Sequence, residues 1–229
     1  MLTKNQSIPL SAIKIEQDTQ NCWSVFFERP IGFTFEAGDW VDLQFNDRIL
    51  NGGKTYTIAS SPTEGDVRIT FREGISEFKR ALQQIQPNMR LTITQYGNDY
   101  NFTLKKHQSS TLIAGGVGIA PFRSMIKEMY DNEDQNETTL IYLNQNDDFL
   151  FKKELELWRT ALSRLTIHYI VTKDINRKKR EKLLSSLTPD LHQNFYISGP
   201  TAMVEANEHL LIDRGVDIRN IRIDSFGGY

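Results

Sequence analysis

Thr111-Leu112-Ile113-Ala114-Gly115-Gly116-Val117-Gly118-Ile119-Ala120-Pro121 is the segment that decides the fold of this chain. An apolar run, three glycines and a proline, in that order, are typical of a strand, a tight turn and the start of a helix. Glycine lets a ligand approach the backbone, and proline suits a first helical position because its missing N–H needs no partner there. Unpaired N–H groups at a helix start attract phosphate, so residues 115–121, the glycine turn, form a candidate anion site.

The spacing of the glycine turn is Gly116-x-Gly118-x-x-Pro121, which lacks the last glycine of the dinucleotide fingerprint. By itself the turn also fits a packing role without any ligand. A similar element, Ser198-Gly199-Pro200, follows a later apolar run. Parallel sheets bind ligands beyond the carboxyl ends of their strands, and a dinucleotide is long enough to reach two such ends. The two elements together therefore predict a nucleotide site.

Composition and charge exclude several classes of function. The chain has 229 residues, 39% of them apolar, and its formal net charge of −2 gives no sign of a nucleic-acid partner. A single cysteine, Cys22, rules out a disulfide framework and an iron–sulfur cluster held by the chain's own thiolates, and the four histidines lack metal-ligand spacing. The histidine spacing leads us to expect no metal site. Because no apolar leader or run of membrane-spanning length is present, we also expect a cytoplasmic protein without a membrane span.

The apolar pattern changes near residue 105, which predicts two domains. Short apolar runs separated by glycine and proline extend from Ile8 to about Leu104, as in an antiparallel β-barrel. Beyond residue 110, strands alternate with helices, as in a parallel sheet built from βαβ units. We expect a β-barrel domain at residues 1–106 and a nucleotide-binding α/β domain at residues 107–229. The expected strands include 22–27, 40–45, 67–71, 90–94, 112–114, 139–143, 167–171 and 195–198, and the expected helices are 76–85, 121–130, 151–164, 180–187 and 201–214.

The barrel half contains two segments that suit a flavin nucleotide. In Lys54-Thr55-Tyr56-Thr57-Ile58-Ala59-Ser60, a cation, an aromatic ring and hydroxyl groups lie within one extended run, and they can hold a phosphate, cover a flat ring and donate to its heteroatoms. In the second segment, Arg72 to Ser76, Gly74 turns the chain and Ser76 is a candidate N-cap whose helix start also suits a pyrophosphate. An ordinary half-exposed strand and an ordinary cap remain the alternatives.

In this combination the chain resembles the ferredoxin–NADP reductase superfamily, in which an FAD-binding barrel precedes an NAD(P)-binding domain. The family's flavin motif Arg-x-Tyr-Ser-x-x-Ser is similar to residues 54–60, and its second phosphate loop is similar to residues 72–76. The opening of its nicotinamide domain is similar to residues 115–121, and its Cys-Gly-Pro element to Ser198-Gly199-Pro200. The ending, residues 224–229, looks like the aromatic tail that shields the flavin in many members.

The resemblance implies a role for individual residues. Tyr56 is expected to pack against the isoalloxazine ring, with Thr57 near its N5 atom, while Phe226 or Tyr229 covers the other face and yields to nicotinamide. The expected catalytic residues are Thr57, Ser198, Phe226 and Tyr229. The expected FAD-binding residues are Lys54, Tyr56, Thr57, Ser60, Arg72, Gly74, Ile75 and Ser76, and the expected NAD(P)H-binding residues are Gly116, Val117, Gly118, Pro121, Gly199 and Pro200.

Three departures from the family pattern affect these expectations. Lys54 replaces arginine, so the charge stays but the bidentate fork is lost, which favours weaker binding of FAD or tolerance of FMN. Ser198 replaces the usual cysteine, which favours slower hydride transfer. The strand at 139–143 ends in Asn144-Gln145-Asn146, without the acidic residue of many NAD sites or the arginine of many NADPH-using members. The basic run at 177–180 suits a 2′-phosphate but equally a solvated face, so the coenzyme preference stays open.

The sequence predicts an FAD-dependent NAD(P)H oxidoreductase. We expect it to move a hydride from NADPH or NADH to bound FAD and to pass electrons to ferredoxin, flavodoxin or another redox protein. One alternative is a flavin reductase that uses flavin as a dissociable substrate. Another is a non-catalytic subunit that binds flavin or nucleotide and relays or senses redox state.

Overall fold

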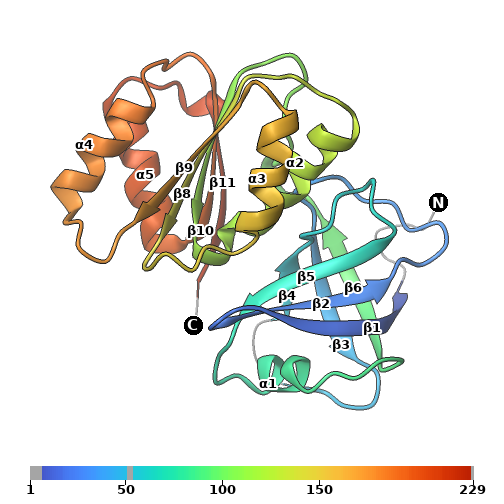
Figure 1. Cartoon of the computed structure of the whole chain (residues 1–229). Coiled ribbons are helices and arrows are strands. Elements are labelled where there is room, and N and C mark those ends of the chain that lie inside the picture. The colour runs from blue at the N-terminus through green and yellow to red at the C-terminus, as the bar shows by residue number, and fades with distance from the viewer. Residues whose placement is uncertain (1–6, 51–53, 228–229) are drawn as a thin grey trace. The chain divides into compact units, whose positions relative to one another are not determined.

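The computed structural model describes residues 7–50 and 54–227 of the chain (Figure 1). The described residues form two compact units. The first contains residues up to Asp99 together with Ala120–Glu128, and the second contains Tyr100–Ile119 and Met129–Gly227. The chain passes from the sheet of the first unit to that of the second between Gly97 and Ser110, and the expected domain boundary after Lys106 lies in this connection.

The first unit contains a six-stranded antiparallel sheet in the order β4-β3-β6-β1-β2-β5. Its strands are β1 (Ile8–Thr19), β2 (Cys22–Glu28), β3 (Trp40–Phe45), β4 (Thr55–Thr57), β5 (Asp66–Arg72) and β6 (Arg90–Gly97). A further bridge between Ile58, directly after β4, and Ile69 of β5 joins the two outer strands. The sheet is therefore closed at its edges, which confirms the predicted antiparallel barrel.

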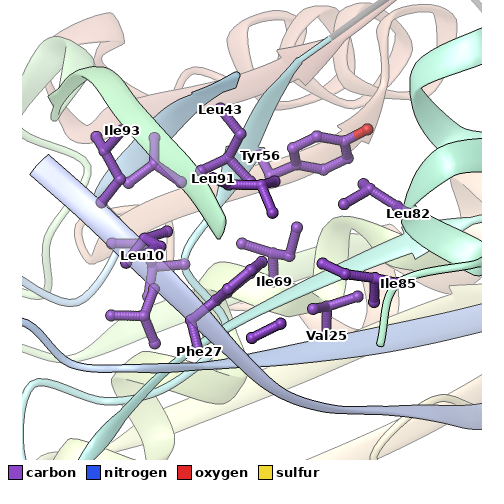
Figure 2. Close-up of a cluster of buried hydrophobic side chains, with 14 of the residues drawn as sticks. Leu10, Val25, Phe27, Leu43, Tyr56, Ile69, Leu82, Ile85, Leu91 and Ile93 are labelled. Atoms are coloured by element: carbon purple, nitrogen blue, oxygen red, sulfur yellow. The ribbon is translucent and has the colours of Figure 1, made fainter. Parts of the chain in front are cut away.

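Alternating side chains of these strands fill the barrel. Along β3, Val41, Leu43 and Phe45 are buried, while the residues between them are not, which is the period-2 pattern of a half-buried strand. Helix α1 (Glu77–Gln83) adds Phe78 and Leu82 to the same core, and Ser76 is its N-cap, as predicted. Figure 2 shows this apolar cluster, with Tyr56 at its margin and the tyrosine hydroxyl pointing away from the other side chains.

We expect the barrel core to carry much of the stability of the first unit. Ile69 is fully buried (0% exposed), so Ile69→Ala should lower the free energy of unfolding by about 2–5 kcal/mol, because it removes apolar contacts and leaves a cavity. Ile31 is fully exposed (102%), and Ile31→Ala should change it by less than about 0.5 kcal/mol. Urea unfolding measures both values, and equal losses for the two variants would contradict this account of the core.

The second unit contains a five-stranded parallel sheet in the order β11-β10-β7-β8-β9. Its strands are β7 (Ser110–Gly115), β8 (Thr138–Asn144), β9 (Leu165–Val171), β10 (Asn194–Pro200) and β11 (Ile221–Phe226). The α-helices from residue 120 onward are α2 (Ala120–Asp131), α3 (Lys152–Ala161), α4 (Arg177–Leu187) and α5 (Thr201–Asp213), and short 3₁₀ helices span Asp99–Asn101, Gly116–Ile119 and Ile218–Asn220. No helix in the described ranges is long and apolar enough to cross a membrane.

Helices lie on both faces of the parallel sheet. Figure 1 shows α4 and α5 on one face and α3 on the other. On the first face, Ile113, Ile141 and Ile197 of three neighbouring strands form one buried cluster with Leu184 of α4 and Val204 of α5. A sheet covered on both faces explains why these strands read as continuous apolar runs, and it confirms the predicted α/β unit.

Two details differ from the sequence-based expectation. Helix α2 begins at Ala120, one residue before Pro121, and a 3₁₀ turn over Gly116–Ile119 precedes it. The segment expected to be only a tail forms strand β11, because its backbone pairs in parallel with β10 from Phe195↔Ile221 to Pro200↔Phe226. Tyr229 lies outside the described residues.

Candidate functional site

The two glycine-containing turns pack directly against each other at the carboxyl ends of β7 and β10, which are neighbouring strands. A Cβ atom added at Gly118 would lie 2.2 Å from the carbonyl oxygen of Ser198 and 2.7 Å from the Cα atom of Gly199. One added at Gly199 would lie 3.2 Å from the Cα atom of Gly115. Backbone thus touches backbone, so glycine is required here by packing, and contact with a dinucleotide stays a prediction.

Tyr142 of β8 fixes the start of the glycine turn. Gly116 has a φ of 56°, the left-handed region that favours glycine, and its carbonyl oxygen accepts a hydrogen bond from the Tyr142 hydroxyl at 3.0 Å. The Tyr142 ring is buried and packs edge-on against Phe149, with 5.0 Å between ring centroids. Sequence reasoning missed Tyr142, because a tyrosine within an apolar strand gives no sign of its distant partner.

Strand β11 brings an acidic residue to the second turn. Ser198 is buried and lies beside Asp224 in the parallel pair of β10 and β11, and its hydroxyl donates a hydrogen bond to Asp224 Oδ2 at 3.1 Å. Phe226 lies opposite Pro200 at the end of the same pair and is partly exposed. The predicted residues Ser198, Pro200 and Phe226 therefore meet at one end of the sheet, beside Gly118.

Substitution of Gly118 tests the contact between the turns. Gly118→Ala should lower the free energy of unfolding by about 1–3 kcal/mol or more, because the added methyl group overlaps the Ser198 carbonyl and forces the backbone to move. Gly65→Ala is the matched control, since nothing lies within 4 Å of a methyl group there. Urea unfolding compares the two, and a Gly118→Ala protein as stable as the control would refute the contact.

The predicted flavin strand lies at the margin of the barrel core. Tyr56 of β4 is buried, and its ring centroid lies 6.2 Å from that of Phe71 and 6.1 Å from that of Phe78. These two phenylalanines flank the second phosphate segment, residues 72–76, in the sequence. Thr57 is half-buried opposite Trp40, and Lys54 is exposed just before β4. Ser60 is buried, and its hydroxyl accepts a hydrogen bond from the Arg68 backbone N–H at 2.9 Å.

Two cations accompany the second phosphate segment. Arg72 ends β5, and the side chain of Lys79 from the first turn of α1 lies over Gly74, with its Cδ atom 3.0 Å from a Cβ added there. Burial and the charge of Arg72 lower the pKa of Lys79. Ser76 Oγ accepts a hydrogen bond from the Lys79 backbone N–H at 3.3 Å, and Ile75 is exposed. Arg72 and Lys79 offer two cationic side chains beside Gly74 that suit an anion, while Glu73 and Glu77 add negative charge to the same segment. Lys79 was not predicted as a site residue.

Helix α2 contributes a buried ion pair that sequence reasoning also missed. Arg123 Nη1 and Nη2 lie 2.5 Å and 3.0 Å from the Oε2 and Oε1 atoms of Glu64, and Nη1 also donates to the Ala59 carbonyl at 3.0 Å. Ser124 Oγ donates to the Ser60 carbonyl at 2.7 Å. In an amphipathic helix an arginine is normally read as exposed, and its partner Glu64 lies far away in the sequence.

The ion pair should make stability depend on pH. Burial raises the pKa of Glu64, but the hydrogen bonds and charge of Arg123 outweigh it, so the pKa lies below its ordinary value. A carboxyl group with a lowered folded-state pKa stabilises the fold above its unfolded-state pKa, and this contribution is lost as the pH falls through the folded-state value. Urea unfolding should therefore find Glu64→Gln less stable than the natural protein by about 1–3 kcal/mol at pH 7, with the gap closing below about pH 5. An undiminished gap at pH 3 would exclude the ion pair as its origin.

The predicted site residues fall into groups within the two units. Gly116, Val117 and Gly118 lie with Ser198–Pro200 and Phe226 in the second unit. In the first unit, Tyr56 connects the flavin strand to the second phosphate segment through its ring contacts with Phe71 and Phe78. Pro121 is buried in the first turn of α2.

The comparisons with known proteins agree with this arrangement. The family model for the oxidoreductase NAD-binding domain matches residues 112–209. NADH-cytochrome b5 reductase 2-B of Vanderwaltozyma polyspora is 30% identical over 177 residues, which cover 69% of this chain and 57% of that protein. The glycine betaine monooxygenase reductase subunit of Chromohalobacter salexigens is 21% identical over 234 residues, which cover 94% of this chain and 63% of that protein. The chain thus spans about three fifths of the length of these two relatives.

The crystal structure of a ferredoxin NADP+ reductase from Neisseria gonorrhoeae, with bound FAD and NADP, has the same fold, with a TM-score of 0.77 at 17% identity and 100% of each chain covered. An antiparallel barrel followed by an oxidoreductase NAD-binding domain defines the class of protein. The chain contains an oxidoreductase NAD-binding domain at residues 112–209 and has the fold of the ferredoxin–NADP reductases, the superfamily that its motifs resemble.

Proposed function

We propose that this protein is an FAD-dependent oxidoreductase that moves a hydride from NAD(P)H to bound FAD and passes the electrons to a separate acceptor. The observation that carries the proposal is the interlocked pair of glycine turns, beside Ser198, Asp224 and Phe226, at the carboxyl ends of β7, β10 and β11. Nucleotides bind at this position in open parallel sheets. The matched NAD-binding domain family supports the same assignment.

The barrel residues fit FAD chemically. Arg72 and Lys79, with the α1 start at Ser76, supply charge and N–H donors for a pyrophosphate, and exposed Lys54 adds a further charge beside β4. The Tyr56 ring and the Thr57 hydroxyl lie on one short strand, where they would contact the flavin ring. Bound FAD would supply an N5 atom that accepts a hydride and a ring that releases electrons singly or in pairs.

The second unit would orient the coenzyme. The backbone N–H groups of Gly116, Val117 and Gly118 would face its phosphates, beside Gly199 and Pro200. Pro121, at the start of α2, stays a proposed coenzyme-binding residue. The Ser198 hydroxyl donates to Asp224, and we propose that this hydrogen-bonded pair lies beside the bound nicotinamide. We keep Phe226 as a proposed catalytic residue; Tyr229, proposed with it, lies outside the described residues.

The acceptor would be a redox protein such as ferredoxin or flavodoxin, or an oxygenase component. One relative is named as a reductase of cytochrome b5 and another as the reductase subunit of a monooxygenase, which supports a protein acceptor here. We propose a cytoplasmic location for the reaction.

A flavin reductase is the second candidate function. Lys54 is exposed and has no bidentate fork, which favours weaker retention of the flavin than arginine would give. Bound FAD after gel filtration would argue against this candidate. Bound FAD without any NAD(P)H oxidation in the presence of ferricyanide would instead favour a non-catalytic redox subunit.

Anaerobic stopped-flow mixing tests the proposal directly. Purified protein with bound FAD, mixed separately with NADH and with NADPH, should lose its visible flavin absorbance in a single phase, because the hydride reduces the flavin ring. The ratio of the two rates gives the coenzyme preference. Protein that binds FAD but stays oxidised with both coenzymes would overturn the proposed activity.

A further inference from the structure

A polar network surrounds the end of the predicted flavin motif. We call its three side chains, Glu64, Arg123 and Ser124, the peptide clamp. They hold two consecutive backbone carbonyl groups, since Arg123 donates to Ala59 O at 3.0 Å and Ser124 donates to Ser60 O at 2.7 Å. Glu64 pairs with Arg123 and accepts a hydrogen bond from the Ser61 N–H at 2.7 Å. All of these residues belong to the first unit.

Two of the three clamp side chains are buried, and Glu64 is 22% exposed. The Arg123 side chain is only 3% exposed, and Ser124 is fully buried. A buried ion pair often contributes less stability than apolar side chains of similar volume would, because both charges lose their hydration. The Arg123 guanidinium donates to the Glu64 carboxylate and to the Ala59 carbonyl at the same time, which fixes the position of these two groups relative to each other.

The other side of the same backbone is fixed as well. The Ala59 N–H donates to the Arg68 carbonyl at 2.7 Å, and the Ser60 hydroxyl accepts from the Arg68 N–H at 2.9 Å. In a trans peptide the N–H points opposite to the C=O. The clamp on Ala59 O therefore also sets the direction of the Ser60 N–H, which points away from Arg123.

These contacts set the position of the strand that precedes them. Tyr56 and Thr57 are joined to Ala59 through Ile58, whose N–H donates to the Asp39 carbonyl at 2.8 Å. Little rotational freedom is left between the clamped peptides and β4. A change in the clamp would therefore reach Thr57 through the single residue Ile58, and Tyr56 through Ile58 and Thr57.

We propose that Arg123 is a positioning residue for the bound flavin, which acts through the peptide groups of Ala59 and Ser60 together with Ser124 and Glu64. This proposal rests on the proposed function, because it assumes that residues 54–60 contact FAD. Arg123 itself need not touch the cofactor. It holds the backbone whose side chains and N–H groups do.

The test compares Arg123→Lys and Ser124→Ala with a matched control, Arg214→Lys. Lysine at 123 keeps a charge near Glu64 but cannot hold the carboxylate and the Ala59 carbonyl together. Arg214 also donates to two backbone carbonyls, Ser185 O at 3.2 Å and Thr188 O at 2.7 Å, but in the second unit. Ser124→Ala removes one hydroxyl group and keeps the test valid if Arg123→Lys folds poorly.

FAD binding to the apoprotein, measured by quenching of flavin fluorescence, should weaken about tenfold in Arg123→Lys and about threefold in Ser124→Ala. Flavin reduction at saturating NAD(P)H should slow about tenfold in Arg123→Lys, with the KM for the coenzyme within about twofold of its original value. The visible circular dichroism of bound FAD should change in both variants. Arg214→Lys should match the natural protein within about twofold in every flavin measurement.

The outcomes separate the two proposals. If the natural protein binds and reduces FAD, but both clamp variants keep its FAD affinity and circular dichroism and lose only thermal stability, the clamp is purely structural and the positioning role is wrong. An equal loss of FAD affinity in Arg214→Lys would also overturn it. If the natural apoprotein binds no FAD, the proposed function fails, and the positioning role fails with it.

Discussion

The contact between the Gly118 backbone and the Ser198–Gly199 backbone is the constraint on which the second unit depends. Two neighbouring parallel strands, β7 and β10, end in turns whose backbones touch at Gly118, and the Met203 side chain packs against Gly115 and Gly199. This contact holds the 3₁₀ turn over Gly116–Ile119 against the end of β10. It involves the backbone of Ser198, whose hydroxyl donates a hydrogen bond to Asp224 of β11. Glycine packing therefore helps to position the polar side chains of the candidate site.

In the first unit, side-chain hydrogen bonds position the backbone of the candidate site. The end of its flavin motif is held by buried polar groups, with Arg123 and Ser124 on one side of the backbone and Arg68 on the other. Such groups are costly to bury unless each is hydrogen-bonded. The Tyr56 ring packs against Phe71 and Phe78 of the apolar core, so this predicted site residue is also part of the core. The second unit thus positions its turns through backbone contact at Gly118, and the first unit positions residues 59–60 through side-chain hydrogen bonds.

Much of this architecture could be predicted from the sequence, because its signals are local. The strands read as apolar runs, Ser76 reads as a cap, and the two glycine and proline elements occur at strand ends. What could not be predicted depends on contacts between distant residues. Strand β11 requires β10 as a partner, Tyr142 requires the Gly116 carbonyl, and Arg123 requires Glu64, which is 59 positions away. An arginine on an amphipathic helix gives no local sign that it is buried.

Helix α2 carries both Arg123 and Ser124, the side chains that hold the Ala59 and Ser60 carbonyl groups. It begins directly after the glycine turn, and Arg123 and Ser124 fall within its first turn and a half. Its apolar residues Phe122, Met125 and Ile126 are all buried, so neither the apolar face nor the polar pair faces water. A helix is stiff over so short a distance, because consecutive backbone hydrogen bonds link each turn to the next. A shift of α2 would therefore move the Arg123 and Ser124 atoms that hold the carbonyl groups of Ala59 and Ser60 within the first unit.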